Sequence, residues 1–224
     1  MENVSNGENE KSLEILGAEA LAELDDETRT HAVTFIASYL NRIYGNCIWV
    51  GVLYLARMFS KSDKKRGDNQ FDLFEFIADV IQLFAFLFFP LQNLHYWGIL
   101  KETYQETRIG EVINFGRAHK VAIVYTVSFF IAVVAIGIPA LLHGVFNVTF
   151  NNNTIDELWT ITQYSFCFSV AVLLWSFFVA YANRSAFKKI VECYGDEELI
   201  DIVEEQYSIR NALFTRETLL SKLR

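Results

Sequence analysis

The sequence has few cysteines, and none is placed to cross-link the chain or to hold a metal. The three are Cys47, Cys167 and Cys193. An odd set of widely spaced cysteines gives no disulfide framework, and no pair has the CxxC spacing of a zinc site. We therefore expect a protein that folds without disulfides and uses neither a metal nor another cofactor.

The motifs of the common enzyme classes are missing as well. The four histidines are far apart, so neither HxxxH nor HExxH occurs. The chain also has no GxSxG sequence and no phosphate-binding loop. These absences favour a protein that is not an enzyme.

Positive charge is in short supply too. The chain has 19 Lys and Arg against 27 Asp and Glu, a net charge of −8, and no basic face that would suit nucleic acid. Residues 1–30 are polar and acidic without an apolar centre, so we expect no cleavable signal peptide. The first apolar segment would then act as the insertion signal.

What the chain does have is long uncharged apolar runs. Of its residues 52% are hydrophobic, and 20 are Phe. Residues 121–142 and 158–182 contain no charged side chain. A segment of roughly 20 apolar residues crosses the hydrocarbon core of a bilayer as a helix. The two runs therefore predict an integral membrane protein.

Two further spans are expected nearer the N-terminus. The run at 80–100 contains Pro90, which removes a backbone donor and should kink the helix. The first run is interrupted by Asn41 and Arg42, so the alternative is an interfacial helix up to Leu40 and a short span after it. The predicted fold is all-α, an up-down bundle of four transmembrane helices within residues 32–182, with spans at about 36–59, 80–100, 121–142 and 158–182.

The two ends are expected to lie outside the membrane. Residues 1–31 are predicted to be an acidic, largely disordered tail, with a short helix at 12–24 as the alternative. Residues 183–224 are predicted to be a cytoplasmic tail, in which 196–214 forms an amphipathic helix that packs on the membrane-side face, on itself or on a partner. The charged segment 101–120 could hold a surface helix.

Charge also predicts the orientation. Loops rich in Lys and Arg stay on the cytoplasmic side, and the loop at 144–157 has neither residue. Both termini are therefore expected to be cytoplasmic, and Asn147 and Asn152 in the outer loop match the glycosylation pattern. The basic loop at 60–70 conflicts with this, and the alternative is three spans with 71–100 re-entering the membrane. We favour four spans.

One set of polar side chains is a candidate ligand site. Consecutive spans run antiparallel, so Arg42 near the start of the first shares a level with Gln92, Asn93 and His95 near the end of the second. Charge inside a span is expected to face the bundle interior or a wet pocket, and an anion or lipid headgroup would suit this set. We favour the simpler interpretation, in which Arg42 extends to the headgroups while the amides bond between helices.

Two smaller candidates lie elsewhere. Arg57, Glu75 and Asp79 are predicted to form an ion pair that closes the first hairpin, with a cation-attracting vestibule as the alternative. Cys193 would be close to the inner membrane surface, where it is a candidate for palmitoylation, although we favour an unmodified thiol.

These observations predict a multi-pass, non-enzymatic membrane component that acts as a subunit, adaptor or scaffold. Its expected partners are the lipid bilayer, a protein bound through the C-terminal tail, and a second copy of the chain. One alternative is a channel or small-solute transporter that uses a polar layer around Arg42 and His95. Another is a receptor-like, partial serpentine protein, which a longer chain with three more spans would support.

Overall fold

The structure, a computed structural model, describes residues 3–62, 73–146 and 152–213 of the 224. Side chains are described mainly within 13–55, 88–134 and 164–212. The elements of the described residues are all helices, which confirms the all-α prediction. In chain order they are α1 Asn3–Ala22, α2 Asp26–Ser62, α3 Leu73–Tyr104, α4 Arg108–Ile113, α5 Phe115–Phe146, α6 Asn152–Tyr194, α7 Glu197–Gln206 and α8 Ile209–Leu213.

Several helix ends are set by local sequence. The carboxylate of Asp25 accepts a hydrogen bond from the backbone N–H of Thr28 (3.0 Å) and so caps α2, and this bond lowers the pKa of Asp25. Asp196 caps α7 in the same way, through the N–H groups of Glu198 and Leu199. Between α6 and α7, Gly195 has φ +83°, a conformation that favours glycine and lets the chain reverse.

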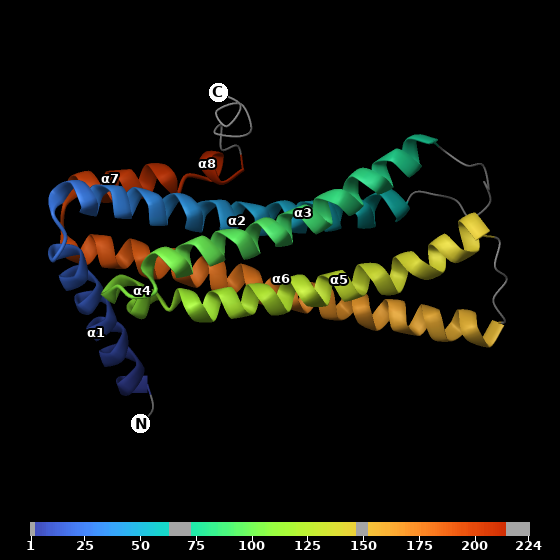
Figure 1. Cartoon of the computed structure of the whole chain (residues 1–224), viewed down its shortest axis with the longest axis horizontal. Coiled ribbons are helices and arrows are strands. Elements are labelled where there is room, and N and C mark those ends of the chain that lie inside the picture. Colours follow the sequence, from blue (N-terminus) through green and yellow to red (C-terminus); the bar gives the residue numbers. More distant parts are fainter. Residues whose placement is uncertain (1–2, 63–72, 147–151, 214–224) are drawn as a thin grey trace.

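Four long helices, α2, α3, α5 and α6, form the body of the molecule. Each of α2 and α5 packs against both α3 and α6, and Figure 1 shows the four running side by side along the longest axis. Each predicted span lies inside one of these helices. Because α6 has 43 residues, it is about 65 Å long at 1.5 Å per residue, far longer than one span needs.

Small helices close one end of this bundle. We call this end the head: it consists of α1, α4, α7 and α8 with the adjoining parts of the four long helices (Figure 1). One continuous hydrophobic core fills it, and residues from every part of the chain contribute. Its largest fully buried side chains include Leu21, Ile36, Leu40, Ile43, Trp97, Leu100, Phe115, Phe187 and Ile190.

The N-terminal segment differs from the prediction of a largely disordered tail. It forms α1, and α2 already begins at Asp26, because this segment is tied to the head. Ala20 and Leu21 are buried in the core, and the Arg29 Nε donates to the backbone oxygen of Leu21 (2.8 Å). The guanidinium of Arg29 also lies 4.9 Å from the ring centre of Tyr194 on α6. These contacts join distant parts of the chain, so the acidic composition of the tail does not reveal them.

The C-terminal segment also differs in detail. Its predicted single helix at 196–214 is broken at Tyr207 and Ser208 into α7 and α8. The apolar face of α7, with Leu199 and Val203, is buried against the bundle, whereas Glu197 and Glu198 on its opposite side are exposed. Within this chain, α7 packs against α2 and α6, and α8 packs against α2.

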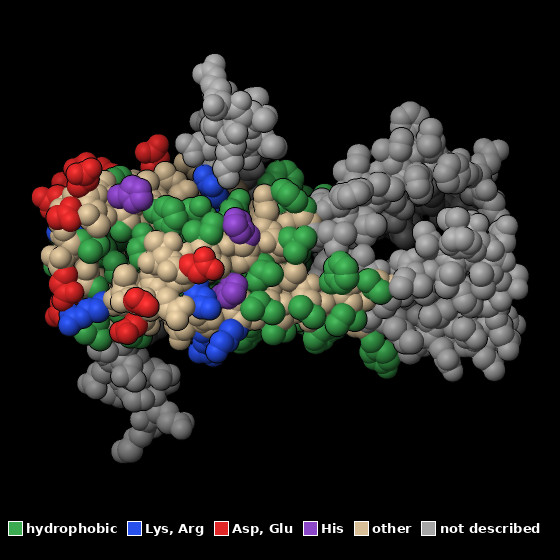
Figure 2. All heavy atoms as spheres, in the orientation of Figure 1, with side chains coloured by type: hydrophobic (Ala, Val, Ile, Leu, Met, Phe, Trp, Pro, Cys, Tyr) green, Lys and Arg blue, Asp and Glu red, His purple; other side chains and the backbone are tan. Residues whose placement is uncertain are grey.

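Charged and apolar side chains occupy different parts of the surface. Figure 2 shows acidic and basic side chains gathered over the head, while hydrophobic side chains cover the middle of the molecule as far as the atoms drawn in grey. The exposed large hydrophobic residues of the four long helices lie in this middle part. They include Val52, Leu55, Phe88, Leu91, Val124, Val127, Phe130, Phe168, Leu174, Trp175 and Phe178, each at least 46% exposed.

One helical stretch among the described side chains, Val170–Tyr194, is long and apolar enough to cross a membrane. Only 22% of its apolar window is buried within the protein, whereas the core helix of a soluble protein is mostly buried. A single such stretch gives weak support for a membrane association.

Candidate functional site

A layer of buried and half-buried polar side chains lies between the long helices just beyond the head. The side-chain amide of Asn46 on α2 donates to the Oδ1 of Asn93 (2.9 Å) and to the Oε1 of Gln92 (3.3 Å) on α3. The amide of Asn93, which is 2% exposed, donates in turn to the sulfur of Cys47 (3.4 Å). That sulfur also contacts the hydroxyl of Ser176 on α6 (3.9 Å). The layer therefore joins three of the four long helices.

The structure brings together two of the four residues predicted to bind a ligand. Gln92 and Asn93 meet through Asn46, which is not among the residues predicted from the sequence. Asn46 lies one helical turn after Arg42 and so on the same face of α2, and this spacing is the signal that could have identified it.

Arg42 and His95, the other two predicted ligand-binding residues, lie at opposite ends of a row of aromatic rings. The guanidinium of Arg42 is 5.6 Å from the ring centre of Tyr39, and that ring packs edge-on against Tyr96 at 5.3 Å. His95 is exposed, with its ring 6.1 Å from that of Tyr96. Ligand binding by this set stays a prediction.

The smaller candidates are mostly beyond the described side chains. Arg57 lies in α2, Glu75 and Asp79 lie in α3, and Asn152 begins α6, but their side chains are not described. Asn147 lies outside the described residues, so the ion pair and the glycans stay predictions. The thiol of Cys193 is free and exposed at the end of α6. It lies roughly 16 Å along the helix from the end of the predicted span, at 1.5 Å per residue. Its palmitoylation also stays a prediction.

A second cluster, not foreseen from the sequence, fastens the C-terminal segment to the bundle. The guanidinium of Arg184 on α6 lies between two rings, 4.6 Å from that of Tyr44 on α2 and 4.4 Å from that of Tyr207 after α7. It also donates to the backbone oxygen of Tyr207. Burial lowers the pKa of Arg184 and raises that of the Tyr207 hydroxyl, so the cation faces a neutral phenol.

Two further contacts hold the same segment. The ammonium of Lys188 donates to a carboxylate oxygen of Glu204 on α7 (2.9 Å), and this bond raises the pKa of Lys188. The backbone of α8 comes close to Gly45 on α2, where a Cβ would lie 1.9 Å from the backbone oxygen of Ala212. Only a glycine lets the two backbones come this near.

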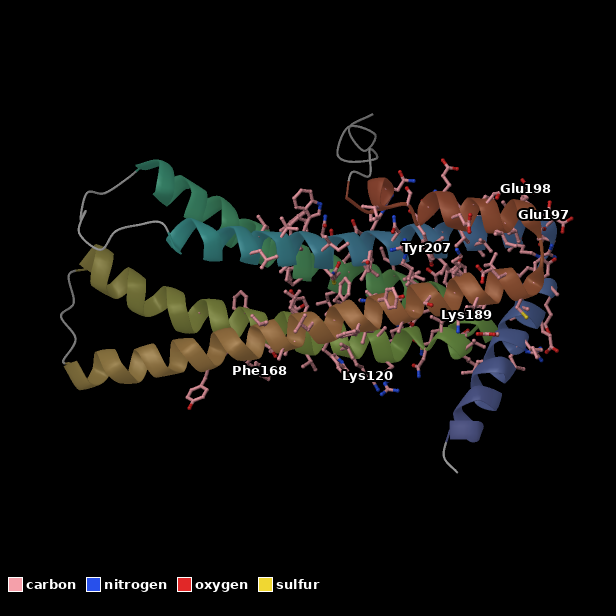
Figure 3. The ribbon with its side chains drawn as sticks, turned by 180° about the vertical axis from the view of Figure 1, so that it is seen from behind. Lys120, Phe168, Lys189, Glu197, Glu198 and Tyr207 are labelled. Carbon is pink, nitrogen blue, oxygen red and sulfur yellow. The ribbon has the colours of Figure 1, made fainter. Side chains whose placement is uncertain are left out.

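The cluster borders an open cavity of about 470 Å³ between α6 and α7. Figure 3 shows Tyr207 between the ribbons of α2 and α6, and Glu197 and Glu198 at the far end of the head. The cavity is lined by Tyr181, Arg184, Ser185, Lys188, Glu204 and Tyr207. It offers cations, a hydroxyl and aromatic rings to a ligand.

Within the described ranges, no three His, Cys, Asp or Glu side chains are grouped so that they could hold a metal ion. No family model matches the chain, and neither the curated proteins nor the solved structures include one significantly similar to it.

Proposed function

We propose that this chain is a multi-pass membrane component whose four long helices cross the bilayer with their uncharged halves, while the head stays in water. The observation that supports it is the position, on each helix, of the charged side chain that borders the uncharged run on the side of the head. From the head outward these are Arg42 on α2, Lys101 on α3, Lys120 on α5 and Arg184 on α6. Beyond them each helix continues with an uncharged run.

Contacts between the helices allow these four positions to be compared. Asn46 opposes Asn93, Cys47 opposes Ser176, and the Thr126 hydroxyl lies 3.3 Å from the backbone oxygen of Pro90. We use these pairs to align the helices and count about 1.5 Å per residue along each of them. All four charged residues then lie closer to the head than Asn93 does, by roughly 4–12 Å along the bundle axis. Four separate helices thus lose their charge within a band about 8 Å thick, which is the behaviour expected at a membrane surface.

The side chains beyond this band are those that suit lipid. Val127 and Phe130 on α5 are 52% and 57% exposed, and Leu174 and Phe178 on α6 are 54% and 61% exposed. Soluble monomers rarely expose contiguous apolar surface on all sides of a bundle. Ile36, Leu40 and Ile43 contribute to the core of the head, so we propose that the first crossing begins after Arg42 rather than at residue 36. This is close to the alternative considered above, in which the first span is short and begins after Leu40.

The head suits a subunit, adaptor or scaffold. The exposed side of α7 carries carboxylates at Glu197, Glu198 and Asp201. We propose that a protein partner binds on this side of the C-terminal segment, with a second copy of the chain as the other candidate. Both termini are then cytoplasmic and the 144–157 loop faces the other side.

The test is the response of the full chain to extraction and to glycosidase. The chain expressed in animal cells should stay in the membrane pellet after alkaline carbonate treatment and require detergent for release. Removal of N-glycans should increase its mobility, and Asn152→Gln together with Asn147→Gln should abolish that change. Release by carbonate would contradict the membrane proposal, and a glycan attached elsewhere would contradict the orientation.

The buried amide layer favours a channel or small-solute transporter as a second candidate, because polar side chains inside a membrane bundle often line a pathway. Here the prediction is that Arg42→Ala, or Asn46→Leu within the layer, abolishes solute flux in reconstituted vesicles. Unchanged flux in both variants would remove this candidate. The hypothesis of a receptor-like protein would be supported only by a longer chain with three more spans.

A further inference from the structure

The cavity between α6 and α7 lies where the charged head meets the apolar part of the bundle. Arg184, the last charged residue of α6 before the uncharged run, is part of its wall, and Tyr181 is one turn further toward the apolar part. The cavity is open, so a ligand can enter it from the side of the bundle. Its position at this boundary distinguishes it from an ordinary surface hollow on the head.

One face of α6 connects the cavity to the apolar surface. Leu174, Phe178, Tyr181, Ser185 and Lys188 follow one another at steps of four, three, four and three residues, which places them in one line along the helix. The first three are exposed by 54%, 61% and 54%. The last two line the cavity. The line therefore changes from apolar through aromatic to polar within about four turns.

The cavity offers recognition groups for an anion. Arg184 and Lys188 are cationic and Glu204 is anionic, so its charged lining has a net charge of one positive unit. Ser185 adds a hydroxyl. Tyr207 is 9% exposed, and its buried hydroxyl has no hydrogen-bond partner among the described residues. Because that hydroxyl is buried, the accessible hydroxyls of the cavity come from Ser185 and Tyr181.

We propose that this cavity binds the phosphate headgroup of an anionic phospholipid, whose acyl chains lie along Leu174 and Phe178 on α6. The proposal rests on the proposed function, since it requires that this part of α6 is in the membrane. Both parts of the lipid suit the surface they would contact. The phosphate suits the cations and hydroxyls of the cavity, and the acyl chains suit the exposed apolar side chains of α6. Glu204 and Tyr207 come from α7 and its end, so the site is complete only while α7 is docked.

The ion pair between Lys188 and Glu204 provides a sharp test. Lys188→Gln and Glu204→Gln each remove one partner of the ion pair that joins α6 to α7 (2.9 Å). The second pair that Lys188→Gln loses, with Glu192 (3.6 Å), lies within α6, so both variants would have the same effect if Lys188 and Glu204 only held α7 in place. In a lipid site they have opposite effects, because one removes the attracting charge and the other the repelling charge. A basic side chain near the membrane surface is worth ~1 kcal/mol, which corresponds to about a fivefold change in affinity.

The experiment uses the full chain, purified in a detergent without phospholipid, and titrated with phosphatidylglycerol or phosphatidylcholine. Bound lipid is counted by native mass spectrometry. We expect preference for phosphatidylglycerol, weakened about fivefold by Lys188→Gln and strengthened about fivefold by Glu204→Gln. Lys189→Gln is the matched control, because this neighbouring lysine pairs with Glu14 (3.3 Å) outside the cavity, and it should leave the affinity unchanged.

The other outcomes overturn the proposal in identifiable ways. Equal binding of the two lipids, or a shift of the same sign in the Lys188 and Glu204 variants, would show that the cavity does not recognise the headgroup. Glycerol phosphate is added as a soluble competitor, and displacement at the same concentration as the lipid would mean that free phosphate esters are the ligand. If the same chain resists carbonate extraction while showing no lipid preference, this inference fails and the membrane proposal stands.

Discussion

A methyl group at Gly45 should detach the C-terminal segment from the bundle. Gly45 lies in α2, and an added Cβ would be 1.9 Å from the backbone oxygen of Ala212 and 2.7 Å from its carbonyl carbon. Both atoms belong to the backbone of α8, so no side-chain rotation can relieve the clash. The variant Gly45→Ala must therefore move α8 away, and with it the end of α7.

The size of the effect follows from two opposing contributions. Replacing glycine by alanine inside a helix stabilises it by about 0.5–1 kcal/mol, whereas overpacking typically costs about 1–3 kcal/mol. Because the contact at Gly45 is with backbone, we take the upper part of that range and expect a net loss of about 1–2 kcal/mol. Gly51 in the same helix is the matched control, since a Cβ there meets nothing within 4 Å, and Gly51→Ala should be neutral or stabilising.

Limited trypsin digestion measures the detachment, because Arg210 lies in α8. When opening is fast compared with cleavage, the cleavage rate follows the population of the open form. A loss of 1–2 kcal/mol then corresponds to about a five- to thirtyfold faster cut after Arg210 in Gly45→Ala. Equal cleavage rates in the Gly45 and Gly51 variants would refute the close contact between α2 and α8.

Three other changes test the head and the polar layer. Arg29→Ala should lower the stability of α1 by about 2 kcal/mol, because it removes a partly buried charged donor to the backbone of Leu21, and hydrogen exchange in α1 should become faster. Arg108→Ala is the comparison: it breaks an exposed ion pair with Glu23 and should cost under about 1 kcal/mol. Asn93→Ala should lower the melting temperature in detergent, at a cost of about 1–2 kcal/mol, since Asn46 loses its nearer partner; no shift would contradict the amide layer. Burial and the charge of Lys101 lower the pKa of His119, so the unfolded chain binds a proton at this imidazole more tightly than the folded chain does. The free energy of unfolding should therefore be at its full value above about pH 6.5 and should fall below that pH. In His119→Gln this decline should be smaller.

The positions of the long helices could be predicted because their signal is local. Uncharged runs of sufficient length predict helices whether lipid or protein covers them, and each predicted span lies within one helix of the structure. The helix in the charged segment 101–120 was also foreseeable and is α4. These features depend on the order of residues along a single element, which is what a sequence displays.

The relative rotation of the helices could not be predicted in this way. Arg42 and Asn46 lie on one face of α2, and only packing decides that Asn46 reaches Asn93 while Arg42 lies over Tyr39. The cavity has the same origin, since Arg184 and Tyr207 become neighbours only when α7 folds back on α6. The order of α1 also arises from tertiary contacts, and its acidic composition conceals them.

The depth of individual residues in a bilayer tests the central claim most directly. Nitroxide labels would be placed one at a time at Phe178, which is 61% exposed on α6, and at Glu197 at the start of α7, with the exposed Cys193 replaced by serine. Their collision rates with oxygen and with a water-soluble nickel chelate are then compared in vesicles. Membrane-crossing helices with a head in water predict that oxygen dominates at 178 and the nickel chelate at 197. Dominance of the nickel chelate at both positions would contradict the account.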